Sequence, residues 1–510
     1  MNRRSFVLSW GRKIFFGISW PLSTLIALLY LKSFVLPQTP TDWVYYVTTL
    51  IGHYGIANAI VYFLLYCPIV LLMPTYYVSR FWSLLLILIL NLFILLDAVA
   101  FSSYQLHIYS FLSKLVMSEG VQNLVGANGT MIGAIGLVVL AVVIWIRGER
   151  VWRYMQTRFS NPVKNWYLVL IVLCLLIGKS IYHYGSIDPR LSSLFPLDFN
   201  PKREDENKVV DTRTLHYPSS KLSCTGKNNP NIVMIVIKEW SQDQLNPELM
   251  PNVFHMKKHG MSFNSHYSVS TDANGGIFSL YYSIPSSYQT TAKDVSPAIM
   301  TELDRRQYEI VDLGNDATAT SSPSEHDEKT LQSFKDWANN RSSDLIQSYS
   351  LNLTFIQHAG EVDKLIQSVV LELQKEGLLK DTYIVMTGGH SGPSSLMMPL
   401  LVFTPDRKAD EIDHATSSYD VIPTLMDTAL GCKKVYHSVG LGKSLFDEGR
   451  DWLLVSGKDN FKILDLSKSV LTTVAGGNIS DVSLKGGEAQ PRRELIFKAL
   501  KINNKYTKPN

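Results

Sequence analysis

The sequence contains little charge and few cysteines. Only 18% of its 510 residues are charged, and its formal net charge of +4 is too small to predict a nucleic-acid partner. Its four cysteines form no Cys-x-x-Cys pair or Cys/His cluster, so nothing predicts a structural zinc site. Cys67 and Cys174 lie in apolar stretches, where a buried thiol is expected. Cys224 and Cys432 could form a disulfide in an oxidising compartment, and the sequence leaves this open.

Apolar residues are abundant instead, and they are concentrated before about residue 184. Five apolar stretches are long enough, or nearly so, to cross a bilayer as helices. They cover residues 14–36, 44–73, 80–102, 131–146 and 166–184. The first is too long for a cleaved signal peptide and lacks a small-residue cleavage site, so we expect it to be retained. The sequence therefore predicts an α-helical membrane domain of five transmembrane helices over residues 1–184.

The basic residues predict how these helices are oriented. They gather before the first stretch, after the second, and between the fourth and fifth, namely Arg3, Arg4, Arg12, Lys13, Arg80, Arg147, Arg150, Arg153, Arg158 and Lys164. The alternate loops, 37–43 and 103–130, contain Lys114 as their one basic residue. Because basic loops stay in the cytoplasm, we expect a cytoplasmic N-terminus, with everything after Tyr184 on the opposite side of the membrane.

Two ionisable residues lie within the apolar stretches, His53 and Asp97. Such groups are costly at membrane depth, and an ion pathway would normally need more of them. We therefore expect both to make polar contacts inside the helix bundle. Residues 103–125 mix apolar and polar positions and could form a helix along the outer membrane surface.

Residues 185–230 have the composition of a linker, rich in Pro, Ser, Asp and Lys. Arg190, Lys202 and Arg203 follow the fifth stretch at headgroup height, where they could bind the phosphates of anionic lipids. Three acidic residues at 204–206 cancel this charge, so a solvated linker is the alternative. Both interpretations stay open.

Residues 231–510 show strands that alternate with helices. Apolar runs at 231–240, 350–358, 382–390 and 398–405 are typical of buried strands, and residues 361–377 have the pattern of a helix that ends on a glycine. This alternation predicts an α/β domain with a central, mostly parallel sheet and helices on both faces. Ligands gather at the carboxyl ends of such strands, here Lys238-Glu239 and Gly388-Gly389-His390.

Several segments resemble a known family. In the second half, "NIVMIVIKEW", "STDANGGIFSLYYSIPSSY", "GLLKDTYIVMTGGHSG", "MPLLVFTPD" and "HATSSYDVIPTLMDTALG" follow one another as in the sulfatase, phosphoethanolamine-transferase and lipoteichoic-acid-synthase branch of the alkaline phosphatase superfamily. In the first half, "IGHYGIANAIVYFLLYCP" and "LLDAVAFSSYQLHIYSFL" look like spans of the YejM/PbgA inner-membrane proteins. The resemblance follows nearly the whole chain in order.

The resemblance implies a protein of the bacterial inner membrane with five spans and a periplasmic sulfatase-like domain. It also implies a role in envelope homeostasis, in which lipopolysaccharide is sensed and its synthesis is restrained through a cytoplasmic-side protein partner. Cardiolipin is a second lipid that the resemblance suggests. On this interpretation the arginine-rich loop 147–164 is the largest surface for that partner.

The resemblance also implies a catalytic site, but the metal-ligating residues expected there are absent. Esterolysis in this superfamily needs a hydroxyl or thiol nucleophile and divalent metals held by carboxylates and histidines. Where relatives end the first strand with a metal-binding carboxylate, this sequence has Lys238, followed by Glu239. A protonated lysine cannot ligate a metal, and Glu239 would point to the opposite face of the strand.

The nucleophile and the remaining ligands are also in doubt. Thr271, followed by Asp272, is the natural nucleophile candidate, yet counting back from Phe278 without a gap places Ala273 there. Thr271 and Asp272 equally suit a helix cap. The expected Asp-His pair reads Gly389-His390, and the later histidine expected before "PLL" is missing.

Two functions follow from this pattern. The first is a catalytically silent membrane regulator, in which Thr271, Asp272 and His390 are vestigial, no cofactor binds, and Lys238 stands where the metal stood and holds Thr271, Asp272 or an anion. The second is an active phosphatase or headgroup transferase that uses Thr271 with Mg, Mn or Zn. A transporter is disfavoured because the spans lack internal repeats and broken-helix pairs.

Overall fold

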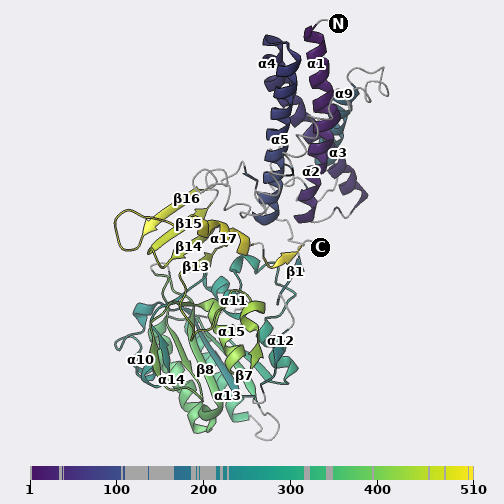
Figure 1. Ribbon diagram of the computed structural model, residues 1–510. Helices are drawn as coiled ribbons and strands as arrows, with labels where there is room; N and C mark the ends of the chain where they lie inside the picture. The colour runs from purple at the N-terminus through teal and green to yellow at the C-terminus, as the bar shows by residue number, and fades with distance from the viewer. Residues whose placement is uncertain are drawn as a thin grey trace. The chain divides into compact units, whose positions relative to one another are not determined.

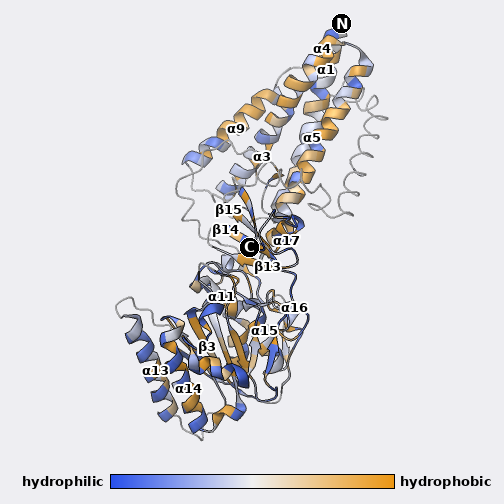
Figure 2. Cartoon of the chain, turned by 90° about the vertical axis from the view of Figure 1, so that its left-hand side faces the viewer, coloured by the Kyte–Doolittle hydropathy of each residue, from blue (hydrophilic) through white to orange (hydrophobic). Residues whose placement is uncertain are grey.

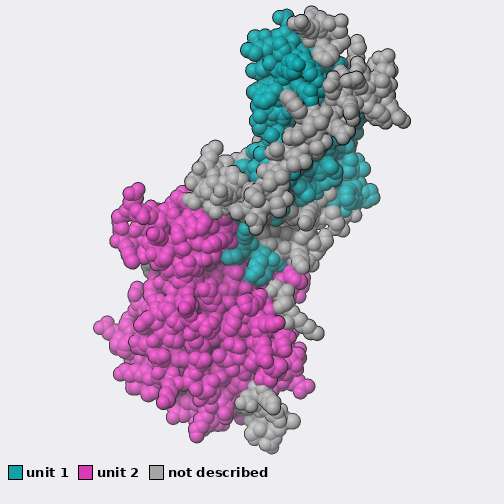
Figure 3. All heavy atoms as spheres, viewed as in Figure 1, with its two compact units in different colours: residues 1–214, 500–510 teal, residues 215–499 magenta. Residues whose placement is uncertain are grey.

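In the computed structural model the chain divides into two compact units, coloured separately in Figure 3, residues 1–214 with 500–510 and residues 215–499. The structure describes residues 3–33, 37, 39–104, 107–108, 136, 166–184, 191, 195, 214–218, 222–226, 229–314, 322–340, 348–392, 395–457, 460–475, 478–503 and 505–508. The break between the units falls within the expected linker. The three-part division of the chain stays a prediction.

The first unit consists of apolar helices (Figures 1 and 2). In the described residues, four helical segments are long and apolar enough to cross a membrane, Val7–Tyr30, Pro40–Leu72, Tyr76–Ser102 and Trp166–Tyr184. They are built from α1 (Arg3–Ile14), η1 (Phe15–Ser19), α2 (Trp20–Ala27), η2 (Leu28–Ser33), α3 (Pro40–Ile60), η3 (Val61–Tyr66), α4 (Cys67–Leu72), α5 (Tyr76–Tyr104) and α9 (Trp166–Tyr184). Four of the five predicted spans are thus present, and the fifth, 131–146, lies outside the described residues, as does most of 103–125.

The buried polar residues of this unit bind one another, as expected. The carboxylate of Asp97 is fully buried and accepts hydrogen bonds from the Tyr30 hydroxyl (2.5 Å) and the Ile108 N–H (2.6 Å). His107 Nδ1 lies 2.7 Å from the same carboxylate. His53 is buried against the rings of Tyr54 and Phe195. Both predicted intramembrane contacts are confirmed.

The second unit is built on a seven-stranded sheet in the order β10-β4-β9-β8-β3-β7-β6. β3 (Asn231–Glu239), β7 (Tyr349–Phe355), β6 (Glu309–Leu313) and β8 (Thr382–His390) run parallel, and β9 (Leu400–Phe403) is antiparallel to its neighbours β8 and β4 (Met261–Phe263). β10 (Asp410–Ile412) pairs in parallel with β4 at the edge. The mostly parallel sheet predicted from the apolar runs is therefore confirmed.

Helices cover both faces of this sheet (Figure 1). On one face α10 (Pro251–Met256), α13 (Pro323–Asn340) and α14 (Ala359–Lys375) pack against alternate residues of β3 and β7, such as Ile235 and Leu353. The other face carries α11 (Ala273–Tyr282), which contacts β3, β8 and the neighbouring α15 (Ser418–Thr428). Gly377, with a positive φ of 71°, ends the α14 region as the sequence predicts.

A second, antiparallel sheet follows late in the chain and consists of β13 (Trp452–Ser456), β14 (Asn460–Asp465), β15 (Val470–Ala475) and β16 (Asn478–Ser483). It matters for the site because β13 ends beside Thr271. The remaining elements are short, namely β1 (Thr214–Leu215), β2 (Ser223–Cys224), η7 (Gln242–Gln244), η8 (Lys257–His259), β5 (His266–Tyr267), η9 (Ser286–Tyr288), α12 (Ala298–Arg305), η10 (Leu378–Asp381), β11 (Thr416–Ser417), β12 (Cys432–Lys433), α16 (Val435–Ser438), α17 (Glu494–Ile502) and β17 (Thr507–Lys508).

Candidate functional site

The candidate site lies where β3 and β8 end side by side. These strands are parallel, and Glu239 pairs directly with His390. Because successive side chains alternate between the faces of a strand, Lys238 and Gly389 share the face that α11 covers. Glu239 and His390 share the other. The expected metal-ligand positions, 238 and 389, are thus adjacent, but neither holds a carboxylate.

Helix α11 occupies the space that a carboxylate at position 389 would need. A Cβ atom added to Gly389 would lie 3.0 Å from Ile277 Cγ1 and 3.3 Å from the carbonyl oxygen of Ala273. A Cβ atom on Gly276 would overlap the carbonyl oxygen of Gly389, so helix and strand touch backbone to backbone. The aspartate of related enzymes therefore has no room here unless α11 moves away from β8.

The Thr271 hydroxyl is held against the second sheet rather than against a catalytic base. The Thr271 N–H donates to the carbonyl oxygen of Ser456 at the end of β13 (3.1 Å). A Cβ atom on Gly457 would lie 2.6 Å from the Thr271 hydroxyl. A nucleophile of this kind needs a base within hydrogen-bonding distance. Across the ranges given above, no hydrogen bond joins the Thr271 hydroxyl to His390, Asp272 or Glu239.

Asp272 caps α11, as one of the two sequence interpretations expects. It is the N-cap residue, and its carboxylate accepts a hydrogen bond from the Gly275 N–H at 2.8 Å. Ala273, the residue that a gap-free count places at the nucleophile position, is the first residue of the helix. Asp272 thus has a structural role that requires no catalysis.

His390 is partly buried and its Nδ1 atom accepts a hydrogen bond from the Gly392 N–H (3.0 Å). Burial lowers the pKa of His390 and outweighs the nearby carboxylates of Glu239 and Asp272, which act to raise it, while Lys462 lowers it further. The neutral imidazole therefore carries its proton on Nε2. Lys462, on β14, was missed by sequence reasoning because no local pattern links residue 462 to a strand end 72 residues earlier.

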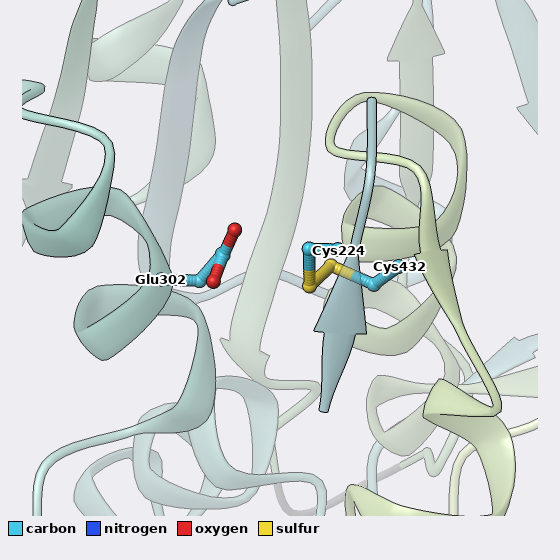
Figure 4. A group of neighbouring side chains, drawn as sticks. All are labelled: Cys224, Glu302 and Cys432. Atoms are coloured by element: carbon cyan, nitrogen blue, oxygen red, sulfur yellow. A yellow bond between two sulfur atoms is a disulfide. The ribbon is translucent and has the colours of Figure 1, made fainter. Parts of the chain in front are cut away.

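The residues at this site do not fit a divalent metal. Within the described part of the chain, the ligand atoms of Glu239, Asp272 and His390 do not all approach within 4.8 Å of one another. The group that does is Cys224, Glu302 and Cys432 (Figure 4). However, the two sulfur atoms are joined in a disulfide, which settles the pairing that the sequence left open.

The third member of that group is also occupied. Arg305 and Arg306 donate hydrogen bonds to the Glu302 carboxylate at 2.6 to 2.8 Å. Burial acts to raise the pKa of Glu302, but these hydrogen bonds prevail and lower it. This cluster is therefore a structural brace between α12 and the β2–β12 pair.

Lys238 points away from the catalytic candidates. Its side chain lines a pocket between α11 and the sheet, with Asp312 and Asn352. No hydrogen bond or ion pair of Lys238 with Thr271 or Asp272 occurs among the described residues, so the contact expected from the sequence is not seen. The proposed lipid-binding residues Arg190, Lys202 and Arg203 lie outside the described residues, as does the loop 147–164.

Comparison with known proteins supports the two-part architecture. The sequence model of a domain of unknown function, DUF3413, matches residues 1–186, and the sulfatase model matches residues 315–432. The inner membrane protein YejM of Salmonella typhimurium is 20% identical over 98% of this chain and 97% of its own length. An uncharacterized protein of Haemophilus influenzae is 19% identical over 88% of this chain and 87% of its own.

A solved structure of similar fold is a protein of the alkaline phosphatase superfamily from Vibrio parahaemolyticus, with a TM-score of 0.45 and 15% identity over 63% of this chain and 95% of that one. The order of helices and strands, the two matched domains and the full-length similarity agree. The chain is therefore a member of the YejM-type inner-membrane proteins, which join a DUF3413 membrane domain to a sulfatase-like domain of the alkaline phosphatase superfamily.

Proposed function

We propose that this chain is a membrane-anchored regulator of envelope lipid homeostasis, responsive to lipopolysaccharide, whose sulfatase-like domain does not hydrolyse esters. The observation that carries the second part is the contact of α11 with β8. It fills the space of the missing aspartate at Gly389, while Lys238 replaces the other carboxylate. Similarity to YejM over nearly the full length supports the first part.

The test of catalytic silence uses the purified full-length protein in detergent. We expect less than stoichiometric Mn, Mg or Zn after dialysis, and no difference between the wild type and Thr271→Ala in hydrolysis of phosphate and sulfate esters. Metal-dependent turnover that disappears in Thr271→Ala would instead establish the alternative function, a phosphatase or headgroup transferase.

The sulfatase-like domain is proposed to lie in the periplasm. The distribution of basic residues favours this orientation, and the Cys224–Cys432 disulfide fits an oxidising compartment. A reporter that is active only in the periplasm should be active when fused after residue 510 and inactive when fused before residue 1. The reverse pattern would refute the orientation.

The lipid is proposed to be lipopolysaccharide or another anionic lipid, bound through Arg190, Lys202 and Arg203. In cells that depend on the chain, Lys202→Glu with Arg203→Glu should disturb lipopolysaccharide levels, whereas Thr271→Ala should not. The matched control is Lys364→Glu with Lys380→Glu, two exposed lysines of the sulfatase-like unit. Equal effects of both charge reversals would exclude a specific lipid site.

The protein partner is proposed to bind on the cytoplasmic side, at the loop 147–164. Replacing its arginines at 147, 150, 153 and 158 with serine should abolish co-purification of that partner. Unchanged co-purification would show that the partner binds elsewhere.

A further inference from the structure

The sheet face beneath α11 is polar where a buried face is normally apolar. All seven residues of β7 are buried. Leu351, Leu353 and Phe355 join the apolar cluster on the opposite face, so Asn352 and Thr354 point toward α11. Strands that are covered on both faces usually carry apolar residues on both. The two polar side chains therefore need an explanation other than packing.

Asn352 has an unmet hydrogen-bonding requirement. Its side chain is 3% exposed, and its Oδ1 atom is buried without a hydrogen-bond partner. Buried side-chain polar atoms in native proteins are nearly always hydrogen-bonded to protein, water or a ligand. An amide without a partner at the wall of a cavity points to a molecule that occupies the cavity.

Such a cavity is present. A pocket of about 470 Å³ lies between α11 and the ends of β3, β7 and β6. Its polar lining includes Lys238, Asn274, Tyr281, Asp312, Asn352 and Thr354. Thr271, Glu239 and His390 do not line it, so this pocket is distinct from the candidate hydrolytic site.

The pocket has one cationic and one anionic side chain in its wall. Lys238 is on β3 and Asp312 is on β6, with β7 between them. Two strand spacings separate these strands by roughly 10 Å, so the two charges flank the pocket rather than pair. Consistent with this, Lys238 takes part in no hydrogen bond or ion pair within the described residues. The carboxylate of Asp312 lies near the Tyr281 hydroxyl, whose pKa is raised by burial and then by Asp312.

We propose that this pocket binds a small zwitterion, with its anionic group at the Lys238 ammonium and its cationic group toward Asp312. The Asn352 amide and the Thr354 hydroxyl hydrogen-bond the molecule between these ends. A second anion would be repelled by Asp312 and a second cation by Lys238, which selects against molecules of one charge sign. The inference does not depend on the proposed regulatory function.

The test measures binding to the purified full-length protein by calorimetry. The probes are ω-amino acids of two to six carbons, which vary the distance between the charges, and O-phosphoethanolamine. Acetate, inorganic phosphate and ethanolamine serve as probes with one kind of charge. We expect one or two adjacent zwitterions to bind at least tenfold more tightly than any of these three.

Substitutions then locate the site. Lys238→Met and Asp312→Asn should each weaken binding at least tenfold, and Thr354→Val, which keeps the side-chain volume, should weaken it a few-fold even if the charge variants fold poorly. Lys462→Met, beside His390, is the matched control and should bind as the wild type does. Competition by nanodiscs that contain phosphatidylethanolamine would show that the pocket takes a lipid headgroup rather than a free solute.

Two results would overturn the proposal. One is binding of the zwitterions no tighter than that of the probes with one kind of charge. The other is unchanged affinity in both a folded Lys238→Met protein and Thr354→Val, which would place the ligand elsewhere.

Discussion

His266 on β5 is a fully buried histidine with a single hydrogen-bond partner among the described residues. Its Nδ1 atom lies 2.9 Å from the Thr416 hydroxyl, and its Nε2 atom has no partner. Burial lowers the pKa of His266 to about 3, although Asp420 acts to raise it, and Arg450 lowers it as well. The folded protein therefore holds this imidazole neutral at pH values where an unfolded chain would protonate it.

This difference predicts how stability depends on pH. A histidine in the unfolded chain has a pKa of about 6.5, so above that value His266 contributes no pH dependence. As pH falls from about 6.5 toward 3, the unfolded state gains a proton that the folded state refuses, and stability declines. At pH 5 the loss is on the order of 2 kcal/mol. Denaturant unfolding of the full chain at pH 8 and pH 5 measures it.

Substitution of this histidine should remove the effect. His266→Gln should lower stability at pH 8, because a buried site is disturbed, but should flatten the decline between pH 8 and pH 5. The matched control is His255→Gln, on the exposed side of α10, which should retain the decline. Equal slopes for the wild type and His266→Gln would contradict this assignment.

The contact between Gly276 and Gly389 gives a second prediction. A methyl group on Gly276 would overlap the Gly389 carbonyl oxygen, and backbone atoms cannot rotate aside as a side chain can. Gly276→Ala should therefore destabilise the protein by about 3 kcal/mol or more, at the upper end of overpacking effects. Thermal unfolding measures the change.

A control glycine is available on the same unit. Gly377 has open space around its Cα atom and a positive φ, which asparagine also tolerates. Gly377→Asn should change stability by less than about 1 kcal/mol. If Gly276→Ala were as stable as Gly377→Asn, α11 would not be in tight contact with β8, and the argument against metal binding would fail.

At the scale of elements, the membrane helices are joined by hydrogen bonds between buried polar side chains. Asn91 on α5 bonds Ser19 and Ser23, and Ser23 in turn accepts from Asn58 on α3. All four are almost completely buried. Polar contacts of this kind hold helices together in lipid, where apolar surfaces alone provide little driving force.

The strongest of these contacts is centred on Asp97. Its two carboxylate oxygens serve the Tyr30 hydroxyl, His107 and the Ile108 N–H, whereas an asparagine offers one oxygen for them. Asp97→Asn should therefore leave a buried donor unsatisfied and lower stability by about 1–3 kcal/mol. The midpoint of thermal unfolding in detergent checks this, with Ser102→Ala at an exposed position of α5 as the control. A midpoint equal to that of the control would show that Asp97 is dispensable.

The elements themselves were largely predictable because their signals are local. The strand expected at 382–390 is β8 to the residue, and the one expected at 231–240 is β3 at 231–239. The strand expected at 350–358 ends instead at Phe355, because the chain turns into the start of α14 at Ala359. Strand order and the reversed direction of β9 depend on long-range pairing, which no local pattern encodes.

The candidate site was only partly predictable for the same reason. The loss of ligands at Lys238 and Gly389 could be read from the sequence, and so could the cap at Asp272. The direction of the Lys238 side chain could not, because it depends on how α11 packs. Neither could the approach of Lys462 and Ser456, which come from a separate sheet.

At the scale of the whole chain, the Cys224–Cys432 disulfide closes a loop of 208 residues. In the chain-entropy description, a loop of this length stabilises the folded state by about 5 kcal/mol. A reductant should therefore lower the midpoint of unfolding of the wild type. The double variant Cys224→Ser, Cys432→Ser should start from the lower value and should not respond to the reductant.

The free cysteine Cys67 provides the control. Cys67→Ser removes a thiol without opening the disulfide, so the reductant should still lower its midpoint. A wild-type midpoint that is the same with and without reductant would show that the disulfide does not contribute to stability.

The same disulfide has a consequence for limited proteolysis. One cut of the backbone between residues 225 and 431 leaves the membrane helices and the late β13–β16 sheet in a single covalent molecule. On a denaturing gel without reductant such nicked protein migrates near the intact chain, and only reduction releases two fragments. A protease could therefore sever the main chain inside the sulfatase-like unit without setting any part of it free from the membrane.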